Sequence, residues 1–318
     1  MCYKNFRLAQ SQGLLNGQVL DMSEDGKVLV SSFVTGIGIW DTRADTVTPF
    51  SSSPGFSPNS MNNNGQFIGQ IIFGGTIPSN AAFWDSITST FLNLNPSSTD
   101  RTVPNSINDS AQIVGSGQLP VPPGFVFDHA TQAVIWENGI MNKLPTLGSE
   151  FHPSSANDIN NLGQIVGSYG DRAVIWENGQ IDALPMIPLF DGRAVATDIN
   201  EHGLIVEIST NGHDGSHGTL WYGNRAIDLN DYLPSDLKDA GWVLTTAKDI
   251  NDDGWIVGEI HKSNGSSHAI LLSTTIPIPP IPEPSTYAML LIGLGVPCFV
   301  VRRRKKRLTL IIVKSLGY

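Results

Sequence analysis

Residues 154–185 read SSANDINNLGQIVGSYGDRAVIWENGQIDALP and contain the pattern that decides the fold. Their centre is a ten-residue block, DINNLGQIVG, which begins at Asp158 and places Asn-x-x-Gly between an apolar residue and an Ile/Val run. An Asn that starts a type I turn caps it through its side chain, and a Gly in the fourth position can adopt the left-handed conformation of a bulge. The block therefore predicts a β-hairpin whose turn is shaped by Asn160 and Gly163.

The same block occurs six times, at intervals of 39 to 52 residues. After each copy a β-rich stretch ends in Trp or in an apolar equivalent, and a further short strand follows most copies. The blocks are DMSEDGKVLV from Asp21, SMNNNGQFIG from Ser60, SINDSAQIVG from Ser106, DINNLGQIVG from Asp158, DINEHGLIVE from Asp198 and DINDDGWIVG from Asp249. The Trp positions are Trp40, Trp84, Trp136, Trp176 and Trp221, with Leu271 or Leu272 in the sixth copy.

These repeats predict an all-β fold. About four short strands per unit of roughly 40–50 residues are typical of β-propeller blades, so residues 1–272 are predicted to form a propeller-like domain of about six blades. An irregular β-solenoid and two β-sandwiches remain alternatives. Ala111 stands where the third block should have Gly, which predicts strain or a different turn. The last repeat lacks an obvious fourth strand, and Phe6 to Ala9 are expected to supply it.

The block resembles the HAF repeat of bacterial exported proteins, over most of residues 17–272. His268-Ala269-Ile270 comes nearest to the His-Ala-Phe triplet that names the repeat. The resemblance implies a β-rich extracellular module and carries no defined chemistry.

The charge of the chain is divided unevenly between its body and its end. Asp and Glu number 29 against 19 Lys and Arg, for a net charge of −10. Residues 302–318 hold seven basic residues and no acidic one, which leaves 12 basic against 29 acidic, or −17, in residues 1–301. Such a body would repel phosphates, so a nucleic-acid partner is excluded. Cys2 and Cys298 lie at opposite ends, so no structural disulfide or zinc site is expected.

The composition changes abruptly after Ser273. Residues 273–284 form a Pro-rich linker, for which an extended spacer is expected. Residues 285–301 carry no charge and just reach the lower limit of about 17 residues for a transmembrane helix. Residues 302–318 are predicted to be cytoplasmic by the positive-inside rule, because they begin with the run Arg302, Arg303, Arg304, Lys305, Lys306 and Arg307.

This arrangement resembles the PEP-CTERM sorting signal, in which Pro282, Glu283 and Pro284 precede a short apolar span and an Arg-rich cluster. The resemblance implies recognition by exosortase, a membrane enzyme of Gram-negative bacteria that make exopolysaccharide, with processing near the Pro-Glu-Pro triplet. Two features depart from the family pattern: eleven residues follow the basic cluster, and Pro297 interrupts the span. MCYKNFRLAQSQGLL shows no export leader, so the start is expected to lie inside a longer gene.

Other candidate sites are weaker. Asp249, Asn251 and Asp253 match the first half of a calcium loop, but no Glu stands at position twelve, so a capped turn is favoured over a calcium site. Asp21, Ser23 and Asp25 are the only other cation candidate. The segment His213–His217 is interpreted as a solvated loop. The repeated Trp residues are expected to pack in the core, and Trp242 and Trp255 to provide exposed contacts.

Together these features favour a non-enzymatic, exported surface or extracellular-matrix protein that acts in adhesion, scaffolding or exopolysaccharide association. Its expected partners are exosortase, the membrane and an exopolysaccharide, and no cofactor is expected apart from the weak calcium candidate. The expected location is an inner-membrane-anchored precursor with an outward-facing repeat domain, and then the cell surface or matrix. The alternatives are a surface polysaccharide-degrading enzyme on a β-propeller and a membrane-held ligand receptor.

Overall fold

The computed structural model describes most of the repeat region and separates the chain into two compact units, Met1–Ala183 and Leu184–Tyr318. The described residues are 18–23, 26–32, 36–44, 46–50, 56–71, 80–95, 101–120, 129–148, 152–188, 190, 192–211 and 215–274. The predicted linker, apolar span and basic tail lie outside these residues, apart from Ser273 and Thr274. No helix among the described residues is long and apolar enough to cross a membrane.

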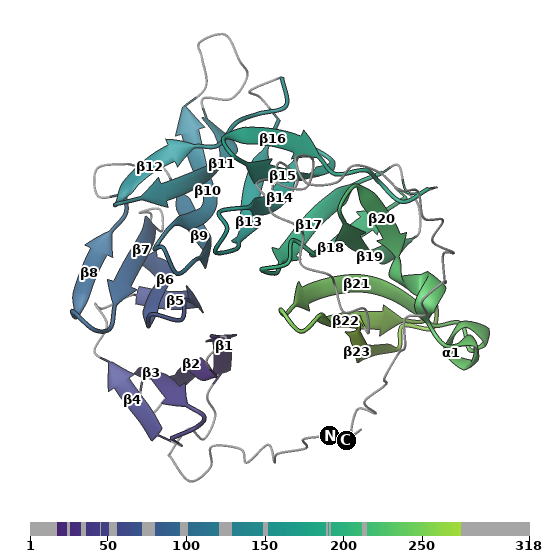
Figure 1. Ribbon diagram of the computed structural model, residues 1–318, viewed down its shortest axis with the longest axis horizontal. Helices are drawn as coiled ribbons and strands as arrows, with labels where there is room; N and C mark the ends of the chain where they lie inside the picture. Colours follow the sequence, from purple (N-terminus) through teal and green to yellow (C-terminus); the bar gives the residue numbers. More distant parts are fainter. Residues whose placement is uncertain are drawn as a thin grey trace, which may run out of the picture. The chain divides into compact units, whose positions relative to one another are not determined.

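The first unit contains four antiparallel sheets of four strands, and in each sheet strands that are consecutive in sequence are paired (Figure 1). One sheet corresponds to each of the first four repeats. The strands are β1 (Gln18–Met22), β2 (Lys27–Ser32), β3 (Gly36–Asp41) and β4 (Thr46–Phe50); β5 (Phe56–Met61), β6 (Gln66–Ile71), β7 (Asn80–Asp85) and β8 (Thr90–Asn93); β9 (Thr102–Ile107), β10 (Ile113–Pro120), β11 (His129–Glu137) and β12 (Ile140–Lys143); and β13 (Ser154–Ile159), β14 (Ile165–Tyr169), β15 (Arg172–Glu177) and β16 (Gln180–Ala183).

The second unit contains the sheets of the last two repeats. They are β17 (Ala194–Ile199), β18 (Ile205–Thr210), β19 (Ser216–Tyr222) and β20 (Arg225–Asp228), followed by β21 (Val243–Ile250), β22 (Trp255–His261) and β23 (Ser267–Ser273). The 3₁₀ helix η2 (Leu229–Tyr232) and the short helix α1 (Ser235–Asp239) connect the two sheets. Within the described residues the last sheet has three strands, as the sequence predicted. The segment Phe6 to Ala9, expected to complete it, lies outside them.

The repeated block forms the predicted turn. Asn160 Oδ1 accepts hydrogen bonds from the backbone N–H groups of Leu162 at 3.1 Å and Gln164 at 3.0 Å, and Gly163 has φ +78°. The backbone N–H of Gly163 donates a hydrogen bond to Asn160 O at 3.1 Å. In the third repeat Ala111 N–H makes the corresponding bond to Asn108 O at 3.0 Å, and Ala111 has φ +57°. Of the two outcomes predicted there, the structure shows the unchanged turn with a strained residue, because a left-handed conformation brings Cβ too close to the following carbonyl oxygen.

Three of the five repeated Trp residues are buried in the core, as predicted. Trp136, Trp176 and Trp221 are fully buried, at most 2% exposed, and Trp40 and Trp84 are half-buried. In the sixth repeat Leu272 takes the Trp place, because it pairs with Ile256 as Trp176 pairs with Ile165. Each Trp lies opposite an apolar residue of the block, so one face of each sheet presents a continuous apolar row.

Candidate functional site

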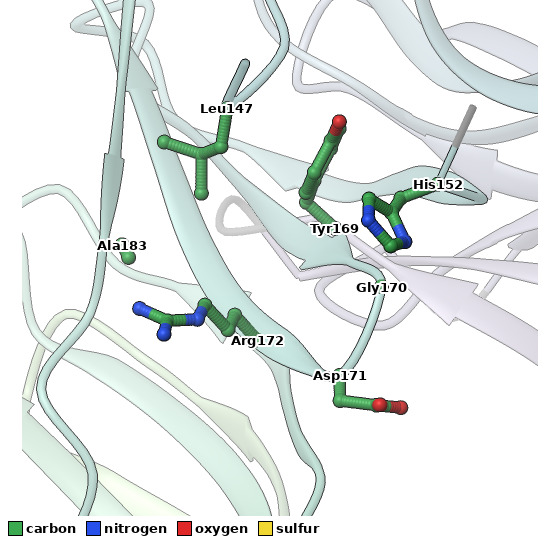
Figure 2. Close-up of a pocket in the computed structure, with 7 residues that line it drawn as sticks. All are labelled: Leu147, His152, Tyr169, Gly170, Asp171, Arg172 and Ala183. Carbon is green, nitrogen blue, oxygen red and sulfur yellow. The ribbon is translucent and has the colours of Figure 1, made fainter. Parts of the chain in front are cut away.

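A cavity of about 480 Å³ lies at the end of the β14–β15 hairpin, in the first unit. This volume is within the range of about 300–1,000 Å³ that is typical of small-molecule pockets. Figure 2 shows the seven side chains and backbone positions that line it: Leu147, His152, Tyr169, Gly170, Asp171, Arg172 and Ala183.

The hairpin turn places two of these residues side by side. Tyr169 ends β14 and Arg172 begins β15, and the two are directly opposite each other in the strand register, so their side chains lie on the same face of the sheet. Gly170 and Asp171 join them, and Gly170, with φ +58°, donates a backbone hydrogen bond to Pro153 O at 2.8 Å. This bond holds the turn against the segment that leads into β13.

The pocket residues continue the apolar row of the core out to solvent. Along β15, Trp176, Val174 and Arg172 alternate onto one face; Trp176 and Val174 are buried, whereas Arg172 is exposed at the edge. Tyr169 is 4% exposed and belongs to the same core as Val174. The His152 ring lies edge-on to the Tyr169 ring, with centroids 5.6 Å apart. The cavity therefore has an aromatic and aliphatic wall with a cation at its mouth.

The charges at the cavity favour an anion. Arg172 has no ion-pair or hydrogen-bond partner among the residues that the structure describes. The Asp171 carboxylate extends away from Leu147 and Tyr169 in the view of Figure 2. An unpaired guanidinium presents planar donors that match a carboxylate or a phosphate.

A second cavity, of about 360 Å³, adjoins the strained turn of the third repeat and is lined by Ser110, Ala111, Gln112, Glu137 and Asn138. Its main polar groups bind each other, because Gln112 Nε2 donates to Glu137 Oε1 at 2.7 Å. The same Gln-to-acid contact recurs between Gln164 and Glu177, at 2.8 Å. We therefore attribute these groups to the repeat framework.

The calcium candidates lie in the turn of the last repeat. Asn251 Oδ1 accepts a hydrogen bond from Trp255 N at 2.8 Å, which is the capping role that the sequence favoured, and the Asp253 side chain is exposed. Within the described ranges no three His, Cys, Asp or Glu residues are grouped as a metal site. Asp25 and the sorting residues Pro282, Glu283 and Pro284, with Arg302 to Arg307, lie outside those ranges.

His217 departs from the sequence interpretation as part of a solvated loop. It lies in β19, paired with Ser209 of β18, its Nδ1 is 2.6 Å from Asp228 Oδ2, and its ring centroid is 4.2 Å from that of Phe190. The loop interpretation is wrong for this residue because the ladder to β18 continues past the glycine at 218. Burial alone raises the pKa of Asp228, but hydrogen bonds from His217 and Asn230 outweigh it and hold the pKa below its usual value.

The two remaining Trp residues are half-buried rather than exposed. The Trp242 ring packs against the core of the second unit. Lys262 Nζ lies 4.7 Å from its centroid, and the His268 ring 4.8 Å from it. The prediction of exposed contact surfaces is therefore wrong for Trp242, because neighbouring side chains cover its ring.

Glu207 is a buried acid that the sequence reasoning missed. It is 0% exposed in β18, where its Oε1 accepts a hydrogen bond from Ser209 Oγ at 2.5 Å. Burial raises its pKa to about 7, although the bond from Ser209 acts in the opposite direction. The available signal was the repeat itself, since four other copies have Gly at this position: Gly69, Gly115, Gly167 and Gly258. The block thus marks Glu207 as an exception.

Comparison with solved structures identifies the fold. The β-propeller domain of the trilobed protease from Pyrococcus furiosus, described as having an open velcro topology, aligns over 80% of this chain and 81% of its own, with TM-score 0.53 and 13% identity. One of two prolyl endopeptidases analysed for inter-domain dynamics aligns over 79% of this chain and 40% of its own, with TM-score 0.52 and 9% identity. At these identities the likeness shows the fold alone. The all-β chain, with one sheet per repeat, has the fold of a six-bladed β-propeller.

No curated protein matches the chain. A family model does match its end: residues 280–305 match the PEP-CTERM protein-sorting motif. The matched range includes the Pro282–Pro284 triplet and the first four basic residues of the tail. The chain thus carries a β-propeller followed by a PEP-CTERM sorting motif, which implies an exported protein that exosortase recognises through a membrane-anchored C-terminal signal.

Proposed function

We propose that this chain is a non-catalytic binding or scaffolding protein that exosortase sorts to the cell surface or extracellular matrix, where it associates with exopolysaccharide. The observation that carries the proposal is the position of the sorting motif, residues 280–305, shortly after the last strand of the propeller ends at Ser273. A surface protein that is sorted in this way requires a folded binding domain followed by a membrane anchor that cleavage can remove.

The proposed roles of the tail follow its chemistry. Pro282, Glu283 and Pro284 form the recognition triplet, and residues 285–301 hold the precursor in the membrane. Arg302 to Arg307 stay in the cytoplasm, since positive charges flanking an apolar span fix its orientation. Removal of the basic tail leaves a body with a net charge of −17, which keeps the sorted domain soluble and self-repelling.

The experiment is co-expression of the full chain with and without an exosortase, followed by fractionation of cells and medium. We expect the propeller to leave the inner membrane only when exosortase is present, and the Glu283→Ala variant to remain there. Glu201→Ala, which changes an acidic residue of the second unit, is the matched control and should be sorted normally. Equal release with and without exosortase contradicts the proposal.

A catalytic role is the second candidate. The observation in its favour is the His217–Asp228 pair, because a carboxylate that orients an imidazole is a common element of general-base catalysis. Turnover of a glycan by the full chain that is lost in His217→Gln would establish this role. Retention in the membrane of an uncleaved chain that still holds residues 302–318 would instead favour a membrane-held ligand receptor.

A further inference from the structure

In four sheets, the residue four positions before the repeated Trp, or before Leu272 in the sixth repeat, has a side chain that contacts a neighbouring residue. Asn80 Nδ2 donates to Asn95 O at 3.1 Å, and Gln132 Nε2 donates to His152 O at 3.2 Å. In the second unit His217 pairs with Asp228 at 2.6 Å, and the ring of His268, four residues before Leu272, contacts the tilted ring of Trp242. This position, near the start of the third strand of each sheet, is therefore held by contacts with neighbouring residues.

In the fourth repeat the same position is held by Arg172, and it has no such partner among the described residues. The acidic neighbour Asp171 lines the same cavity but forms no ion pair with Arg172 among the described residues. The Arg172 side chain lies instead at the mouth of the 480 Å³ cavity. An exposed guanidinium left open beside a cavity is the arrangement of a ligand-binding cation.

We propose that this cavity binds a sugar acid, meaning a pyranose ring that carries a carboxylate. The Arg172 guanidinium would hold the carboxylate through two parallel hydrogen bonds. The exposed His152 ring and the side chain of Leu147 would contact the apolar face of the sugar ring, which a bare anion would not use, and the buried Tyr169 ring would support His152. This inference rests on the proposed function and names the chemistry of the polymer that the propeller would contact.

The test is calorimetric titration of the purified full chain, in mild detergent, with sodium D-glucuronate. Neutral D-glucose, acetate and inorganic phosphate are titrated in parallel. We expect glucuronate to bind at least about ten-fold more tightly than each of the other three, because glucose lacks a carboxylate for Arg172, and acetate and phosphate lack the sugar ring that the cavity wall would contact. Arg172→Gln should weaken glucuronate binding by a similar factor and leave glucose unchanged.

Arg225→Gln is the matched control. Arg225 begins β20 after Gly223, with φ +59°, as Arg172 begins β15 after the Gly170 turn, with φ +58°. Both side chains are exposed, so neither variant should unfold the chain, and only Arg172→Gln should weaken binding. If Arg172→Gln fails to fold, Arg172→Lys carries the test, because it keeps the charge but loses the planar fork; it should still weaken binding.

Three results overturn the inference: no detectable glucuronate binding, equal binding of acetate or phosphate, or equal loss of binding in the Arg172 and Arg225 variants. Equal binding of the simple anions would make this an unspecific anion site. Each of these results leaves exosortase-dependent sorting untouched. Failure of the pocket and failure of the proposed function are therefore distinguished.

Discussion

The side-chain amide of Asn62 donates a hydrogen bond to the carbonyl oxygen of Asn108 at 2.9 Å, across 46 residues of sequence. Asn108 makes the same bond to Asn160 O at 3.2 Å, and in the second unit Asn200 makes it to Asn251 O at 3.0 Å. Asn62, Asn108 and Asn200 thus each cap their own hairpin with the side-chain oxygen and bind the next sheet with the side-chain nitrogen. The Asn that shapes the turn of the repeated block therefore also connects neighbouring sheets.

Substitution of Asn108 by Asp tests this double role. Asn108→Asp keeps the oxygen that caps the turn but replaces the amide donor. It places a carboxylate oxygen beside the backbone carbonyl oxygen of Asn160 and the side-chain amide oxygen of Gln112. We expect a loss of about 1–3 kcal/mol in the free energy of unfolding at pH 7, measured by urea titration. Asn142→Asp, on an exposed position of β12, is the control and should stay within about 0.5 kcal/mol of the wild type. Equal effects would show that the connecting bonds contribute nothing.

The strained turn of the third repeat gives a reciprocal pair of predictions. Ala111→Gly should raise the free energy of unfolding by about 0.5–1 kcal/mol. The left-handed backbone destabilises an L-residue by about 1–2 kcal/mol, and the larger conformational entropy that Gly loses on folding offsets part of the gain from removing this strain. Gly163→Ala should lower it by a similar amount, since space for a Cβ exists there and only the φ of +78° opposes it. Thermal unfolding of both variants checks the pair; shifts of the same sign would contradict the account.

Glu207 should make the protein less stable as the pH rises. Its pKa in the folded state is about 7, raised by burial above its usual value of 4.5, so between these values the unfolded chain releases a proton that the folded chain keeps. The resulting loss in the free energy of unfolding grows from about pH 4.5 to pH 7. It reaches about 3 kcal/mol, because each unit of pKa difference corresponds to about 1.36 kcal/mol. Glu207→Gln should therefore stabilise the chain at pH 8 relative to wild type and have a much smaller effect at pH 4. A pH-independent difference between the two proteins would show that Glu207 is not buried as an acid.

Asp228 should act in the opposite direction. Its pKa is held below its usual value of 3.8 by His217 and Asn230, against the effect of burial, so its stabilisation is present above about pH 4 and is lost as the pH falls further. We expect Asp228→Asn to reduce the free energy of unfolding at pH 6 by about 1–2 kcal/mol, and the difference from wild type to narrow near pH 3. Urea titrations at the two pH values make the comparison. If the difference in unfolding free energy between wild type and Asp228→Asn widened as the pH fell, the lowered pKa of Asp228 would be contradicted.

The local features of this fold were predictable from sequence. Asn160 and Gly163 define a turn by short-range chemistry, and the apolar row through Trp176 follows from the two-residue period of a strand. The repeats then fix the number of sheets. Leu272 could be assigned to the Trp place only through its pairing with Ile256.

Contacts between repeats were not predictable, because their partners are distant in sequence. Asn59 Nδ2 donates to Pro104 O at 2.8 Å and Asn105 Nδ2 to Ala156 O at 2.7 Å, links of 45 and 51 residues. Both Asn residues directly precede a block, but this position does not show which carbonyl oxygen each amide reaches. The open position of Arg172 is of the same kind, since it depends on which neighbours fail to reach it. The candidate pocket therefore emerged from the structure, whereas the sorting motif, residues 280–305, was readable in the sequence.

The most direct test of the central claim is the intact mass of the chain recovered outside the inner membrane from cells that express an exosortase. If exosortase processes the chain near Pro282–Pro284, the mature protein will lack the apolar span and the six consecutive basic residues Arg302 to Arg307. A mature mass that still includes residues 302–318, in cells whose exosortase is active on another substrate, would contradict the account.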